Sequence, residues 1–223
     1  MAQSPAPSRG AAALIAARHL ARRTLVDVHW LISLFGLPGP VVWFQLRARR
    51  LARRSGDTFS LTSVTRPPDL RLLLSVAQGR RRVVELGTAT GWTAISLALA
   101  DPERQVLSCD VVARSEPQRY LGLVGDSVRA RVQLAIRPGS DGPVDDRDAD
   151  LLYIDSSHER EQTIAEVRAW RAALAPGAII VFDDFTHPDF PGVREAVSEL
   201  GLAGDRRGTL FIHRVSRASA GRP

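Results

Sequence analysis

The stretch Arg82-Val-Val-Glu-Leu-Gly-Thr-Ala-Thr-Gly-Trp92 decides the fold class of this chain. A short apolar run passes through Glu85 into a turn with two glycines, Gly87 and Gly91, and a helix is expected to begin at Trp92. Glycine allows a positive φ and a close backbone approach, and a helix N-terminus offers free N–H groups to an anion. This arrangement is typical of a nucleoside-binding crevice at the edge of an open α/β sheet. The glycine spacing is tighter than the dinucleotide fingerprint, and the chain has no lysine, which disfavours a phosphate-binding P-loop.

Positive charge is concentrated in the first part of the 223-residue chain, whose formal net charge is +6. Residues 1–82 carry 14 arginines against three acidic residues, a net charge of +11, whereas residues 83–223 carry 16 arginines against 21 acidic residues, a net charge of −5. The basic character therefore belongs to an N-terminal segment, and the part that holds the glycine turn is mildly acidic.

The single cysteine, Cys109, excludes an internal disulfide and a cysteine-rich zinc site, and it fits a reducing, cytoplasmic compartment. The apolar run over 30–44 is interrupted by Pro38 and Pro40 and is shorter than the roughly 20 apolar residues of a membrane-spanning helix. No signal peptide is expected, because this run starts late and no small-residue cleavage site follows it.

Apolar strands and helices alternate from residue 69 onward, which predicts an α/β fold with a doubly wound, mostly parallel, Rossmann-like sheet. A basic helical N-terminal extension (11–66) is expected before this domain (67–216), with a disordered tail at 1–10 and a flexible tail at 217–223. Strands are expected over 82–86, 105–109, 132–136, 151–154, 178–182 and 209–215. Helices are expected over 11–34, 41–54, 70–77, 92–100, 116–128, 159–174 and 192–200.

Polar residues recur where the expected strands end. Because the carboxyl ends of parallel strands meet at one edge, these residues should line a common rim. Asp110 is placed to accept two ribose hydroxyls, and Ser140 and Asp141 could border an adenine ring. Any single acid could instead cap the next helix, but the whole set favours a ligand rim. The set comprises Glu85, Asp110, Ser140, Asp141, Asp155, Asp183 and Asp184.

Four segments together carry a specific resemblance: Val84-Glu-Leu-Gly-Thr-Ala-Thr-Gly91, Leu107-Ser-Cys-Asp110, Leu152-Tyr-Ile-Asp-Ser-Ser-His158 and Pro176-Gly-Ala-Ile-Ile-Val-Phe-Asp-Asp184. From about Pro68 to Val215 the chain resembles class I S-adenosylmethionine (SAM)-dependent methyltransferases. The last two segments, with Pro191-Gly-Val193, are most similar to the small-molecule, catechol- and sugar-type O-methyltransferases. The resemblance implies that SAM is held by Glu85, Gly87, Thr88, Ala89, Gly91, Trp92, Asp110, Ser140, Asp141 and Asp155.

Asp155, Asp183 and Asp184 present three carboxylates from two neighbouring strand ends. Clustered carboxylates repel one another, and a divalent cation would relieve this. Oxygen ligands suit Mg²⁺ or another hard cation, and the resemblance implies a Mg²⁺ that chelates the acceptor and lowers the pKa of its hydroxyl. The alternative is that the aspartates cap the following turns or contact the cofactor.

Two histidines are candidates for the general base. His158 lies three residues after Asp155, where the resemblance implies a base, and His187 lies three residues after Asp184. A histidine can take a proton near neutral pH. Ser156 and Arg160 depart from the subgroup, which has glycine and often tyrosine there, and these departures concern the acceptor pocket and not the cofactor site.

The basic N-terminal extension has three interpretations. Its tryptophans and arginines over 11–54 suit the surface of an anionic membrane or RNA, or its apolar face packs as a lid or a dimerisation element. We expect an enzyme that methylates a hydroxyl of a small molecule (a sugar, polyketide or phenolic), works as a homo-oligomer and does not bind nucleic acid. The alternatives are an RNA methyltransferase and a non-catalytic, membrane-associated protein of the same fold.

Overall fold

The computed structural model describes residues 28–144 and 148–216. The chain divides into two compact units, Met1–Leu37 and Pro38–Pro223. Of the first unit, residues 28–37 are described, and residues 28–33 are helical, as expected for the end of a helix over 11–34. The rest of that helix and the expected tails, 1–10 and 217–223, lie outside the described residues.

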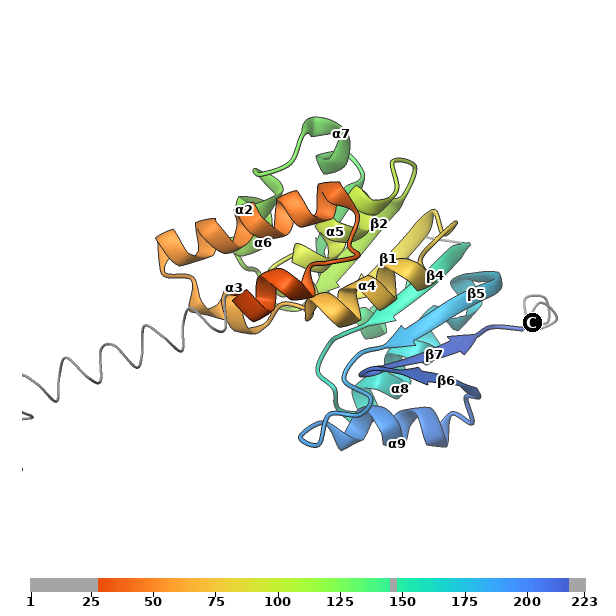
Figure 1. Cartoon of the computed structure of the whole chain (residues 1–223). Helices are drawn as coiled ribbons and strands as arrows, with labels where there is room; N and C mark the ends of the chain where they lie inside the picture. Colours follow the sequence, from red (N-terminus) through yellow and green to blue (C-terminus); the bar gives the residue numbers. More distant parts are fainter. Residues whose placement is uncertain (1–27, 145–147, 217–223) are drawn as a thin grey trace, which may run out of the picture. The chain divides into compact units, whose positions relative to one another are not determined.

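Seven strands of the second unit form one sheet. They are β1 (Arg82–Leu86), β2 (Gln105–Asp110), β3 (Val132–Ile136), β4 (Ala149–Ile154), β5 (Leu174–Phe182), β6 (Gly204–Arg207) and β7 (Leu210–Arg214). Their order is β3-β2-β1-β4-β5-β7-β6 (Figure 1). Strands β1 to β5 are parallel to one another, and β7 is antiparallel to both β5 and β6. The structure therefore confirms the predicted doubly wound, mostly parallel sheet.

Helices cover the sheet in two sets. One set surrounds α5, which contacts α2, α4, α6 and α7, and in the other α8 contacts α9 (Figure 1). The helices are α2 (Gly39–Ser55), α3 (Thr58–Thr62), α4 (Pro67–Val76), α5 (Trp92–Ala100), α6 (Glu116–Leu121), α7 (Asp126–Arg129), α8 (Arg160–Trp170) and α9 (Pro191–Glu199), with 3₁₀ turns η1 (Gly139–Asp141) and η2 (Arg171–Ala173).

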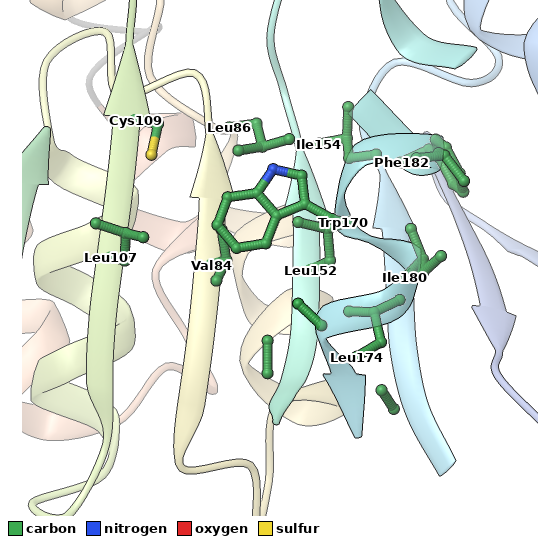
Figure 2. Close-up of a cluster of buried hydrophobic side chains, with 14 of the residues drawn as sticks. Val84, Leu86, Leu107, Cys109, Leu152, Ile154, Trp170, Leu174, Ile180 and Phe182 are labelled. Atoms are coloured by element: carbon green, nitrogen blue, oxygen red, sulfur yellow. The ribbon is translucent and has the colours of Figure 1, made fainter. Parts of the chain in front are cut away.

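Alternation along the strands gives the sheet two different faces. On one face, Val84 and Leu86 of β1 join Leu152 and Ile154 of β4 in the main apolar cluster. Figure 2 shows the indole of Trp170, from α8, lying against these strands. Its Nε1 donates a hydrogen bond to the carbonyl of Gly139 (2.8 Å), which holds η1 beside the carboxyl end of the sheet.

The helix α2 packs on the domain through its buried side. Phe44 meets Trp92 of α5 edge to face, with ring centroids 6.1 Å apart, and Gln45 donates a hydrogen bond to the hydroxyl of Ser96 (3.1 Å). Trp43 lies on the opposite side of α2 and is exposed. None of the helices in the described residues is long and apolar enough to cross a membrane.

The elements differ from the expected ones in four places. The helix expected over 116–128 is two helices, α6 and α7, separated by a stretch that begins at Gly122 and ends at Gly125. The helix expected over 159–174 ends at Trp170, because β5 already starts at Leu174. The start of β5 contains Pro176, and the pairing of β4 with β5 shifts register between Ala149 and Leu151. Two short elements, α3 and the exposed edge strand β6, were not expected.

Candidate functional site

The glycine turn after β1 is shaped by close backbone packing. Gly87 has a φ of 106°, and a Cβ atom there would lie 1.9 Å from the carbonyl oxygen of Asp155, at the end of the neighbouring β4. Gly91 has a φ of 78°, and its Cβ would lie 3.1 Å from Pro117. Position 87 requires glycine for two reasons, its positive φ and the close approach of the Asp155 backbone. The turn thus brings the ends of β1 and β4 together beside the N-terminus of α5.

A cavity of about 590 Å³ opens at this edge of the sheet, within the range of small-molecule sites. Five of the residues predicted to bind a cofactor line it: Gly87, Ala89, Asp110, Ser140 and Asp155. Residues that the sequence analysis did not select complete the wall: Phe59, Cys109, Val111, Arg114, Pro138, Gly139, Ser156, Ser157, Glu159, Gln162 and Glu166. The cavity thus occupies the predicted crevice.

The Asp110 carboxylate is fixed at the floor of the crevice by two backbone hydrogen bonds. The amide of Ala89 donates to one oxygen (2.8 Å), and the amide of Val112 donates to the other (2.9 Å). A carboxylate oxygen can accept more than one hydrogen bond. Asp110 is therefore held in place with acceptor capacity left for a diol.

Glu85 lies away from the cavity. The strand β1 ends one residue later, at Leu86, so alternation turns the Glu85 side chain to the other face, where it is buried and accepts a hydrogen bond from Ser108. Ser108 also bonds Thr88 (2.6 Å). Burial raises the pKa of Glu85 to about 8, helped by the charges of Asp155 and Asp110 and opposed by the Ser108 hydrogen bond. The side chains of Glu85 and Thr88 are therefore buried and do not line the cavity.

Three other residues predicted to bind the cofactor also lie outside the cavity wall: Gly91, Trp92 and Asp141. The Trp92 ring is buried between Phe44 and Tyr120, with which it makes edge-to-face contacts. Asp141 is exposed at the end of η1.

His158 is held between two carboxylates at the carboxyl edge. Its Nε2 lies 3.2 Å from a carboxylate oxygen of Asp155 and 3.6 Å from one of Asp184. Burial lowers the pKa of His158, but the close contact with Asp155 and the charges of Asp155 and Asp184 outweigh it, so the pKa is raised overall. For the carboxyl group of Asp155 the effect of burial has the opposite sign: burial raises its pKa, and the contact with His158 only partly opposes this. The arrangement favours an imidazolium between the two carboxylates.

Asp183 is directed to a different partner. The hydroxyl of Tyr153, a buried residue of β4, donates to Asp183 (2.8 Å) and lies 3.3 Å from Asp155. Burial, with the charges of Asp155 and Asp184, raises the pKa of Asp183 to about 7. The three predicted metal ligands are thus neighbours that face different groups. Within residues 28–144 and 148–216, no group of three or more His, Cys, Asp or Glu residues is placed to hold a metal ion.

The second histidine candidate lies on the loop after β5. The His187 ring packs on Phe190 (4.7 Å between centroids), which in turn stacks on His158 (4.6 Å). The Nδ1 of His187 accepts a hydrogen bond from the amide of Asp189 (3.2 Å). A second cavity of about 690 Å³, lined by His158, Phe190 and charged residues of α8 and α9, shares Ser157 and Glu159 with the first.

Residues 84–185 match a family described as a methyltransferase domain. This match, the strand order and the glycine turn agree with the resemblance to class I SAM-dependent methyltransferases that the sequence predicts. No curated protein sequence matches the chain.

Solved structures share the fold. A protein from Klebsiella pneumoniae, provisionally described as an O-methyltransferase, is 21% identical, with a TM-score of 0.64 over 86% of this chain and 96% of its own. A provisional caffeoyl-CoA O-methyltransferase from Staphylococcus aureus is 13% identical, with a TM-score of 0.63 over 88% and 100%. The O-methyltransferase TomG from Streptomyces achromogenes, which takes part in tomaymycin synthesis and was solved with SAM, is 23% identical, with a TM-score of 0.54 over 76% and 89%. At these identities the likeness concerns the fold.

Proposed function

We propose that this protein transfers the methyl group of SAM to a hydroxyl group of a small molecule, with His158 as the general base. The observation that carries the proposal is the position of the His158 Nε2, within 3.2 Å of Asp155, a residue that also lines the 590 Å³ cavity. Asp155 therefore connects the proposed proton acceptor, His158, to the wall of the cofactor cavity. The O-methyltransferases of similar fold favour oxygen as the methylated atom.

The cavity suits SAM by its shape and by its polar groups. A side chain at Gly87 would clash with the backbone of Asp155, so glycine lets the turn pass close to β4 beside the crevice. Backbone amides hold the Asp110 carboxylate, which could accept hydrogen bonds from a ribose diol. When bound, SAM supplies a methyl group on a positively charged sulfur, which an oxygen nucleophile can attack in line. The remaining polar part of the ligand would lie near the turn at 87–91 and the N-terminus of α5.

His158 would take the acceptor's proton as the oxygen attacks. The carboxylates of Asp155 and Asp184 orient the imidazole and stabilise the imidazolium that forms. Phe190 stacks on the ring and limits its rotation. In this scheme the residues contribute proton transfer and positioning, which are the main needs of a direct methyl transfer.

The second cavity, beside His158, is the candidate acceptor site. Its lining contains Glu161, Asp189, Glu195 and Arg160 around Phe190. Charged and polar groups with a single aromatic suit a hydroxylated molecule of moderate size, such as a sugar, polyketide or phenolic.

Magnesium remains a prediction from the sequence. The oxygen ligands suit a hard cation, but in this arrangement Asp183 faces Tyr153, and His158 lies between Asp155 and Asp184. The residues as placed do not fit a three-carboxylate site, so no step of the proposed reaction uses a metal. We expect protein dialysed against EDTA to keep at least about half of its transfer rate, because proton transfer and positioning in the proposed reaction come from His158, Asp155 and Asp184. A near-complete loss that added Mg²⁺ restores would contradict this expectation and support the predicted metal.

The rate should depend on pH through His158. Only the neutral imidazole accepts a proton, and the pKa of His158 is raised above its usual value of 6.5. The kcat/KM value should therefore increase with pH, with a midpoint above 6.5. In Asp184→Asn one anionic neighbour is lost, the imidazolium is less stabilised, and the midpoint should move to lower pH. A pH profile of both proteins checks this, and a midpoint that stays in place would argue against His158 as the base.

Two assays test the function itself. Isothermal titration calorimetry with S-adenosylhomocysteine should show binding, and transfer of a radiolabelled methyl group from SAM to a panel of hydroxylated compounds should identify an acceptor. Absence of both heat and thermal shift with S-adenosylhomocysteine would refute the proposal.

The partners predicted for the N-terminal extension stay proposals. The packing of α2 on α5 agrees with a lid or dimerisation element whose apolar face meets the domain. Peripheral membrane contact through residues 11–54 and a homo-oligomer can be tested by vesicle sedimentation and by light scattering. The alternative functions, RNA methylation and a non-catalytic membrane role, would require binding to RNA or to vesicles without methyl transfer to small molecules.

A further inference from the structure

Two side chains from distant parts of the sequence meet at the wall of the cofactor cavity. Phe59 of α3 lines the cavity, and so does Arg114, from the loop between β2 and α6. The Arg114 guanidinium lies over the Phe59 ring, 4.3 Å from its centroid, which is a favourable cation–π distance. Phe59 is 37% exposed, so a large apolar ring remains open at the cavity.

The position of Arg114 shows which end of the cavity this pair borders. Arg114 follows Asp110 by four residues, and Val111, next to Asp110, lines the same cavity. Asp110 is the carboxylate that suits the ribose diol. The Phe59–Arg114 pair therefore belongs to the nucleoside end of the proposed SAM site and not to the end near His158.

The short helix α3 is anchored at this place by one carboxylate. Asp57 caps α3 by accepting hydrogen bonds from the amide (2.9 Å) and the hydroxyl (2.7 Å) of Ser60. The same carboxylate accepts a hydrogen bond from the hydroxyl of Tyr120 in α6 (2.7 Å) and pairs with Arg119 (3.4 Å). Tyr120 is fully buried, so Asp57 ties α3 to a rigid part of the domain.

We infer that α3 is a clamp on the nucleoside end of the SAM site: the Phe59 ring, held by Arg114, forms an aromatic wall for the bound nucleoside, and Asp57 positions that wall. Nothing in the family match, residues 84–185, covers α3. The inference rests on the proposed use of SAM. An apolar ring that packs on a nucleoside excludes water from it and strengthens binding.

Calorimetric titration of the full chain with two ligands tests the clamp. S-adenosylhomocysteine contains the nucleoside and the amino acid part, whereas 5′-methylthioadenosine contains the nucleoside and sulfur alone. We expect Phe59→Ala to raise the Kd for both ligands by about tenfold, because one packing face of the nucleoside is lost. Phe59→Tyr keeps the ring and should bind within about twofold of the unchanged protein. Thr62→Ala is the matched control, because Thr62 lies on the same helix and its hydroxyl bonds only backbone carbonyls.

A double-mutant cycle tests the role of Asp57. Asp57→Asn should raise the Kd for S-adenosylhomocysteine by about threefold in the unchanged protein and should have no further effect in Phe59→Ala, since it acts by placing the ring. Independent, multiplicative effects would contradict this role.

The outcomes separate the clamp from the proposed function. If Phe59→Ala binds both ligands within twofold of the unchanged protein, or weakens S-adenosylhomocysteine alone, the inference is overturned. If the unchanged protein binds neither ligand, the proposed function fails first. Thermal unfolding midpoints of all variants show whether a loss of binding reflects a loss of fold.

Discussion

Replacing Gly87 by alanine should leave the domain unable to fold into a form that binds SAM. The new Cβ would lie 1.9 Å from the carbonyl oxygen of Asp155, a backbone atom that cannot move without separating β1 from β4. The backbone also has a φ of 106°, which alanine rarely adopts. We expect a destabilisation of more than about 4 kcal/mol, in the range where a single change consumes most of a domain's stability.

Urea unfolding followed by circular dichroism measures this effect. Gly125→Ala is the matched control, because Gly125 has a φ of −71° and a Cβ there would meet no atom within 4 Å. The control should unfold within about 0.5 kcal/mol of the unchanged protein. If Gly87→Ala unfolded at the same urea concentration as the control, the close approach of the two strand ends would be wrong.

Replacing His158 by asparagine should lower kcat by about 10²- to 10⁴-fold, the usual contribution of a general base. Asparagine is the suitable replacement because His158 has a φ of 60°, and asparagine tolerates this left-handed conformation better than most residues. His158 is not part of the cofactor cavity wall, so the Kd for S-adenosylhomocysteine should change by less than about twofold.

The comparison with His187→Gln identifies the base. The His187 imidazole accepts a hydrogen bond from the Asp189 amide, and the nearest carboxylate with which it pairs is 4.0 Å away. This variant should keep more than about a fifth of the activity. Radiolabelled transfer to an identified acceptor is the assay. Retention of more than a tenth of kcat in His158→Asn, or a larger loss in His187→Gln, would contradict the assignment.

The fold was predictable because its main elements have clear patterns. Continuous apolar runs separated by helices mark the five parallel strands, and the glycine turn marks β1. The elements that were missed have no such pattern. The strand β6 reads Gly-Asp-Arg-Arg, and α3 has only five residues, mostly polar, so both depend on contacts made elsewhere in the fold. The glycines at 122 and 125 divided a helix that the apolar residues alone would continue.

The site was predictable where it depends on strand ends and less so where it depends on side-chain direction. Asp110, Asp155 and Gly87 line the cavity because parallel strands end at one edge. Glu85 lies one residue before the end of β1, so its side chain points to the opposite face from Leu86, and its position at a strand end did not reveal this direction. Tyr153 lies within an apolar strand, and Phe59 lies far from the glycine turn in sequence, so no local pattern marks either of them. Whether each predicted residue binds a cofactor stays a prediction.

The exposed edge strand β6 has a consequence for self-association. Asp205, Arg206 and Arg207 are exposed on it, beside the better buried β7. An unprotected edge can recruit a strand from another molecule and so begin aggregation, whereas charged residues on a short strand oppose such recruitment. Two copies that met at this edge would bring their arginines into mutual repulsion. A dimer of this protein is therefore not expected to pair at β6, and the sheet should end there even at high protein concentration.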